Sequence, residues 1–140
     1  MDLQAQAREF RHAYEVVNNP ERRNFQLTLI NEEHRELLDA HLKVHDYEGA
    51  EADCLKELAD LVYVCFQYAE NLDWDLIEAL RRVHKSNMSK LGDDGKPIRR
   101  DDGKVLKGPN YKPPILDDLT HKKLDLSRYD HWIYRSHRSR

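Results

Sequence analysis

The stretch ELADLVYVCFQYA, residues 57–69, is apolar at almost every position after Glu57, and only Asp60 and Gln67 interrupt it. An α-helix that is apolar nearly all round is buried nearly all round. The stretch therefore predicts a central helix with other helices packed around it. Because Glu57 and Asp60 stand three residues apart, their carboxylates share one face of this helix.

Helical periodicity extends on both sides of this stretch, from the N-terminus to about residue 90. Pro20 and Gly49 break the pattern, and Asp73 is a suitable N-cap for the last segment. Short connections between helices of this length favour an all-α fold, an antiparallel four-helix bundle. The expected helices lie at about 3–18, 23–45, 49–71 and 73–88.

The composition changes after residue 90. Residues 91–116 contain four glycines and four prolines, and Asp102-Gly103 lies between PIRR and KVLK, an arrangement compatible with a small β-hairpin. The rest of this segment is expected to be an ordered loop laid over the bundle. Residues 117–140 form a polar C-terminal tail. We interpret 1–90, 91–116 and 117–140 as parts of a single domain.

The overall composition argues against several classes of protein. With 140 residues and a formal net charge of −3, the chain offers no global attraction to nucleic acid or to an anionic membrane. No apolar run is long enough to cross a membrane, and the N-terminus lacks a signal-peptide core, so a cytoplasmic protein is expected. Cys54 and Cys65 lie roughly 16 Å apart along one helix, too far for a disulfide, and are expected to be small apolar residues in a reducing compartment.

The stretch INEEHREL, residues 30–37, places three glutamates within five residues. On a helical wheel at 100° per residue, Glu33 and Glu36 point into the wide apolar arc, toward the neighbouring helices, and Glu32 lies at its edge. Ionised carboxylates facing a core cost several kcal/mol each unless something compensates them. They can be protonated, pair with basic side chains, or bind hard divalent cations. Only the last option handles all the charge at once.

The residue types also discriminate among metals. A helical di-iron site requires Glu-x-x-His motifs on paired helices, and neither of the helices expected at 23–45 and 49–71 carries one. Zinc sites require histidine or cysteine in number, and His41 and His45 lack the glutamate of a zinc-protease motif. Ligation by carboxylates alone favours Mg²⁺, with Mn²⁺ as a substitute.

The pattern Glu-Glu-x-x-Glu at 32–36, followed by Glu-x-x-Asp at 57–60, resembles the all-α nucleoside triphosphate pyrophosphohydrolases. This superfamily includes the MazG proteins, the dimeric dUTPases and the phosphoribosyl-ATP pyrophosphohydrolases. The segment VHKSNMSKLGDDGKPIRRDDGKVLKGPNYKPP, residues 83–114, is similar to the C-terminal part of phage-type MazG-like proteins, and REFRHAY near the start resembles their first helix. The resemblance covers roughly residues 1–116 and would also suit a phage-encoded protein acting in the host cytoplasm.

The resemblance implies cleavage of a (deoxy)nucleoside triphosphate between the α and β phosphates, giving the monophosphate and pyrophosphate. Carried over by position, Glu32 would be the general base or a ligand of a further Mg²⁺. Asn87 and Lys90 would contact phosphates or sugar, and Lys107 and Tyr111 would cover the nucleotide. The Mg²⁺ ligands would be Glu33, Glu36, Glu57 and Asp60.

Two alternatives stay open. A phosphoribosyl-ATP pyrophosphohydrolase would share the metal chemistry. A non-enzymatic helical interaction module would instead use the aromatic, basic tail as its binding element, at Arg128, Tyr129, Trp132, Tyr134, Arg135 and Arg138. The apolar helix at 57–69 further predicts a homo-oligomer, a homodimer or homotetramer, because a single four-helix bundle would not cover it completely.

Overall fold

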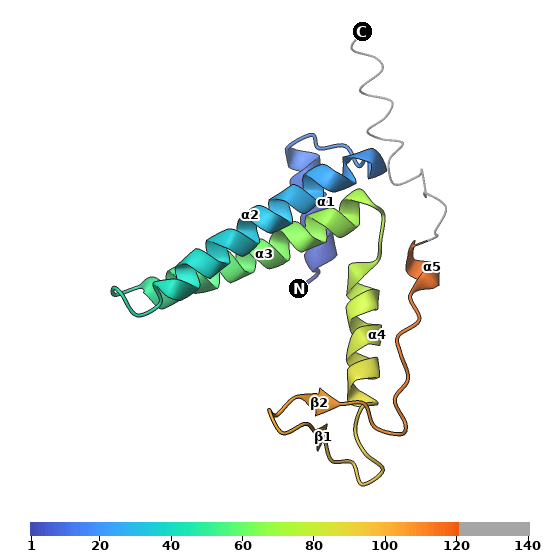
Figure 1. Cartoon of the computed structure of the whole chain (residues 1–140). Coiled ribbons are helices and arrows are strands. Elements are labelled where there is room, and N and C mark those ends of the chain that lie inside the picture. Colours follow the sequence, from blue (N-terminus) through green and yellow to red (C-terminus); the bar gives the residue numbers. More distant parts are fainter. Residues whose placement is uncertain (121–140) are drawn as a thin grey trace. The chain divides into compact units, whose positions relative to one another are not determined.

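Helices α1 (Leu3–Ala13), α2 (Arg23–Leu42) and α3 (Ala50–Asn71) build the first of two compact units in the computed structural model, which describes residues 1–120 (Figure 1). The second unit begins at Asp75 and contains the remaining elements. The prediction of an all-α fold is confirmed, and a two-stranded hairpin is the one sheet in the described chain. The binding tail of the interaction-module alternative lies outside the described residues. The second unit holds α4 (Leu76–Met88), β1 (Ile98–Arg99), β2 (Val105–Leu106) and α5 (Asp117–Thr120).

In the first unit, α2 and α3 run side by side as a long antiparallel hairpin, and α1 packs against α3 (Figure 1). The Asp2 side chain caps α1 by accepting hydrogen bonds from the backbone N–H groups of Gln4 and Ala5. The hairpin turns at residues 43–49, and Gly49, the N-cap residue directly before α3, has a φ of +92°, a value that favours glycine. The predicted helices are therefore present, and α1 ends before residue 18 because Glu15 takes a φ of +54°.

The central helix α3 is less buried than its apolar sequence predicts. Its C-terminal part is buried at Phe66, Gln67 and Ala69, whereas Leu55 and Leu58 are 66% and 45% exposed. The expectation of burial nearly all round is thus wrong for the described residues, in which α1 and α2 pack against this helix and leave part of its surface exposed. Both cysteines are half-buried and free, and burial raises the pKa of the Cys65 thiol.

In the second unit, α4 is capped by Asp75, whose carboxylate accepts a hydrogen bond from the Glu78 backbone N–H. The expected N-cap, Asp73, is two residues too early: it takes a φ of +56° in the turn before the helix. The predicted hairpin is present, with Ile98 opposite Leu106. These local features follow from Asp and Gly residues at turns, where the chain leaves the helical or extended region.

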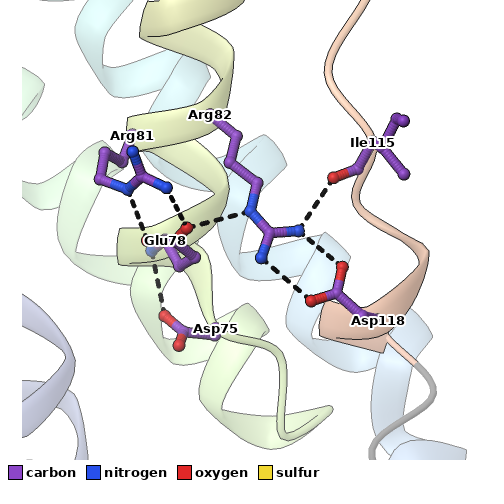
Figure 2. Close-up of polar contacts among 6 residues, drawn as sticks. All are labelled: Asp75, Glu78, Arg81, Arg82, Ile115 and Asp118. Atoms are coloured by element: carbon purple, nitrogen blue, oxygen red, sulfur yellow. Dashed lines mark hydrogen bonds and ion pairs between the residues drawn. The ribbon is translucent and has the colours of Figure 1, made fainter.

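A strap of residues 108–119, without regular secondary structure as far as Leu116 and helical from Asp117, is bound to α4 and to the turn after it at three places. At one end the Gly108 backbone N–H donates to the Lys90 carbonyl at 2.9 Å. In the middle the Ser86 hydroxyl donates to the Lys112 carbonyl at 2.7 Å. At the other end Arg82 binds Asp118 through two hydrogen bonds, and Figure 2 shows both.

Candidate functional site

Three glutamates from two helices meet in the first unit. Glu33 and Glu36 come from α2 and Glu57 from α3, and each offers a carboxylate oxygen within 4.8 Å of the others. The spacing i, i+3 on α2 puts its two carboxylates one above the other on the same face. The antiparallel pairing of α2 and α3 then brings the third carboxylate opposite them.

Two oxygens of this cluster are buried without a partner. Glu33 Oε2 and Glu57 Oε2 are both inaccessible to water and accept no hydrogen bond from any described residue. A buried acceptor left unpaired costs about 1–3 kcal/mol, and more when it is charged. A cation bound between the carboxylates would satisfy both atoms. The all-oxygen donor set fits a hard divalent cation, so these residues could hold one.

Ionisation of this cluster is electrostatically unfavourable. Burial raises the pKa of Glu33 above its ordinary value of 4.5, and the neighbouring charges of Glu36, Asp60 and Glu57 raise it further. The Glu36 side chain, within hydrogen-bonding reach of Glu33, raises this pKa as well. Burial and like charge thus both disfavour the ionised form of Glu33.

Asp60, the fourth predicted ligand, has a basic partner that sequence reasoning missed. Lys56 Nζ lies 2.8 Å from Asp60 Oδ2 and 3.4 Å from Glu57 Oε1. These two carboxylates raise the pKa of Lys56, so the ammonium stays charged. The sequence did contain a pattern that predicts this ion pair, because Lys56 and Asp60 stand four residues apart on one helix. The side chain of Lys56 is largely exposed, so it can leave when a metal competes for the same oxygens.

Glu32, the predicted general base, is exposed on α2 next to this cluster. It follows Asn31 on the side of the helix that water reaches, whereas Glu33 is half-buried. This difference between adjacent carboxylates comes from the 100° rotation per residue. Glu32 therefore lies outside the group of three carboxylates that converge.

The predicted substrate-binding residues all belong to the second unit. Asn87 is exposed near the C-terminal end of α4, and Lys90 follows that helix. The Lys107 ammonium lies 4.7 Å from the centre of the Tyr111 ring, a cation–π contact. The Gly108 backbone N–H donates to the Lys90 carbonyl, and this bond brings Lys107 to the same end of α4 as Lys90.

A second polar cluster in this unit went unpredicted. Arg82 donates through Nε to Glu78 at 3.0 Å and through Nη1 to the Ile115 carbonyl at 3.0 Å, in addition to its paired bonds with Asp118 (Figure 2). Hydrogen bonds from Arg81 and then Arg82 lower the pKa of Glu78 to about 2. Local spacing predicts the Glu78–Arg82 pair, but the bond to Asp118 spans 36 residues and leaves no local signal.

Comparison with known proteins bears directly on these carboxylates. The family model described as phosphoribosyl-ATP pyrophosphohydrolase matches residues 6–87, more than half of the chain. The matched range includes every carboxylate of the cluster and Asn87, and it ends before Lys90. No curated protein matches the chain. None of the helices within residues 1–120 has the length and apolarity needed to cross a membrane.

The family match and the site agree, because the paired helices that present the carboxylate cluster lie inside the matched range. The chain belongs to the phosphoribosyl-ATP pyrophosphohydrolase family, part of the MazG-like all-α nucleoside triphosphate pyrophosphohydrolase superfamily.

Proposed function

We propose that the chain is a Mg²⁺-dependent pyrophosphohydrolase that cleaves a (deoxy)nucleoside triphosphate between its α and β phosphates. The observation that carries this proposal is the cluster of Glu33, Glu36 and Glu57, with two buried oxygens that lack a partner among the described residues. Membership of a family of pyrophosphohydrolases supports the hydrolytic reaction class.

The carboxylates would divide the work between metal binding and proton transfer. Glu33, Glu36, Glu57 and Asp60 would hold the metal, which supplies charge neutralisation on phosphate oxygens and a lowered pKa for bound water. Glu32 would accept a proton from the attacking water while the water oxygen forms a bond to the α-phosphorus. The bond from that phosphorus to the bridging oxygen would break, and pyrophosphate would leave with the electron pair.

The nucleotide contacts are proposed from the second unit. Lys90 and Lys107 carry positive charge suited to phosphate, and the Tyr111 ring offers a face for a base or sugar. Asn87 offers both a donor and an acceptor for a sugar hydroxyl. Replacing any one of them should raise KM more than it lowers kcat, because each would act through binding.

The experiment that tests the reaction class follows the products and the oxygen of water. Nucleoside monophosphate plus pyrophosphate is expected, with ¹⁸O from solvent in the monophosphate and no turnover in excess chelator. Glu36→Gln should abolish turnover, whereas Glu9→Gln, an equal charge change at an exposed site on α1, should not. Orthophosphate plus a nucleoside diphosphate would overturn the proposal.

A second substrate is favoured by the family match itself. The matching model bears the name of phosphoribosyl-ATP pyrophosphohydrolase, and the metal chemistry would be the same for that substrate. A panel of canonical nucleoside and deoxynucleoside triphosphates together with phosphoribosyl-ATP, compared by kcat/KM, separates the two. A preference of about 100-fold or more would assign the substrate.

We also propose that the chain assembles as a homodimer or homotetramer. A mostly apolar groove of about 350 Å³ lies between α1 and α3, and several of its residues are exposed. Covering this surface with another copy would remove apolar area from water. The groove is lined by Leu3, Gln6, Ala7, Leu55, Leu58, Ala59, Val62, Tyr63 and Phe66.

A further inference from the structure

The carboxylate cluster depends on how α2 is placed along α3. Glu33 and Glu36 come from one helix and Glu57 from the other, and a shift of one residue moves a helix by about 1.5 Å along its axis. Mg²⁺ requires nearly ideal octahedral geometry, so such a shift would separate ligands that must converge. What fixes the register of the two helices therefore decides whether the site can form.

Apolar packing along α2 specifies this register weakly. Gln26 is the one fully buried residue of α2, and Phe25, Leu27 and Leu38 are all close to half exposed. Side chains that are only partly buried along a helix pair resist sliding less than a close-packed core does. At one end of the hairpin, the turn at 43–49 connects the helices covalently. Something else must hold the open end.

Asn71 closes that open end. Its Nδ2 donates to the Asn19 carbonyl at 2.9 Å, and its Oδ1 accepts from the Asn19 backbone N–H at 3.0 Å. The side chain thus pairs with both backbone groups of one residue. Asn19 in turn caps the short 3₁₀ helix Pro20–Arg22, which leads directly into α2. Holding Asn19 therefore holds the start of α2 against the end of α3.

Arg11 fixes the orientation of this amide. Its Nη2 donates to Asn71 Oδ1 at 3.0 Å, and its Nη1 donates to Gln67 Oε1 at 3.2 Å. Because a guanidinium only donates, the oxygen of Asn71 must face it, which leaves the NH₂ group for the Asn19 carbonyl. Arg11 Nε also donates to Asn18 Oδ1 at 2.6 Å, so the chain before α2 is held as well. Asn71 is 2% exposed, and such fully paired buried groups are costly to break.

We propose that Asn71, oriented by Arg11, is a positioning residue that sets the α2–α3 register and thereby assembles the carboxylate site. This inference rests on the proposed function for its consequence in metal binding. The register itself can be measured without any metal, so the two ideas can fail separately.

The first measurement is Mn²⁺ affinity by electron paramagnetic resonance. Asn71→Ala should weaken binding by about ten-fold or more, a loss comparable to that seen when metal ligands lose their support. Asn71→Asp keeps the shape and the acceptor but places a carboxylate oxygen against the Asn19 carbonyl, so it should weaken binding too. The matched control is Phe66→Leu, which leaves a cavity at a buried position of the same helix. At a similar loss of melting temperature, this control should keep its Mn²⁺ affinity.

The second measurement is the distance between spin labels at Thr28→Cys and Glu51→Cys, exposed positions on α2 and α3, with Cys54 and Cys65 replaced by alanine. In metal-free protein diluted with unlabelled chains, the Asn71 variants should shift or broaden the distance distribution, and Phe66→Leu should not. Unchanged distances in both Asn71 variants would overturn the inference. If the wild-type protein binds no Mn²⁺ but the Asn71 variants still show the distance change, the proposed function alone would be overturned.

Discussion

The Glu33 side chain is half-buried, has a pKa raised by burial and by the neighbouring charge of Glu36, and has one oxygen that accepts no bond from any described residue. A structural ion pair would have placed a basic group at this oxygen. Instead the Lys56 ammonium, among the described residues, contacts the carboxylates of Glu57 and Asp60. A buried carboxylate oxygen without a partner among the described residues destabilises the fold, and such local destabilisation is typical of a functional site.

We predict that the stability of metal-free protein falls as the pH rises. Because the folded chain binds the Glu33 proton more tightly than the unfolded chain does, this contribution is fully present below pH 4.5 and is lost as the pH passes the raised pKa. Glu33→Gln should weaken this dependence and raise the free energy of unfolding at neutral pH, by at most about 1 kcal/mol because the cluster is partly open to water.

The measurement is chemical denaturation of both proteins in chelator, between about pH 5 and pH 8. Glu9→Gln serves as the control, since its carboxylate is exposed on α1. Excess Mg²⁺ should stabilise the wild type and leave Glu33→Gln nearly unchanged. Equal pH profiles for wild type and Glu33→Gln would show that this carboxylate is not strained.

At the scale of elements, the strap and α4 are held together mainly by polar contacts. Arg82 makes the paired bonds with Asp118 seen in Figure 2, and the Ser86 hydroxyl donates to the Lys112 carbonyl. Ion pairs with exposed partners each contribute little, about 0–1 kcal/mol. The close backbone approach at Gly108 is therefore important for the end of the strap that carries Lys107 and Tyr111.

We predict that Gly108→Ala detaches this end of the strap. An added Cβ would lie 2.6 Å from the Lys90 carbonyl oxygen and 2.7 Å from that of Leu91, and neither backbone atom can move away cheaply. Hydrogen exchange at the backbone N–H of residue 108 should become about ten-fold faster or more. KM should also rise if Lys107 and Tyr111 contact the nucleotide.

The matched control is Gly92→Ala, whose Cβ first meets the movable Asp94 side chain at 3.0 Å. It should leave exchange at residue 108 close to that of the wild type. Wild-type exchange in Gly108→Ala itself would show that the strap is held by its other contacts.

At the scale of the whole molecule, the exposed apolar residues of α3 remain to be explained. We predict a homo-oligomer at micromolar concentration, and Leu58→Lys should convert it to a monomer by placing a charge on the apolar groove. Leu42→Lys, at a residue 78% exposed at the end of α2, should not. Light scattering measures the mass in each case, and a monomeric wild type would contradict the prediction.

The sequence by itself determined the elements and the arrangement of charge within each. Periodicity placed α1 to α4, Asp102-Gly103 placed the hairpin, and the spacing of Glu33 and Glu36 put both on one face. These features depend on residues at most a few positions apart, where backbone geometry alone relates one side chain to the next.

Only the tertiary structure decided which side chains meet across the fold. Asn71 and Asn19 are separated by 52 residues, and Arg11 and Gln67 by 56, so no local pattern relates them. Burial was decided at the same level: the apolar sequence of α3 predicted a covered helix, yet coverage depends on which elements pack against it. The carboxylates were therefore predictable as a pattern. Their convergence depends on the register of α2 against α3, and long-range contacts set that register.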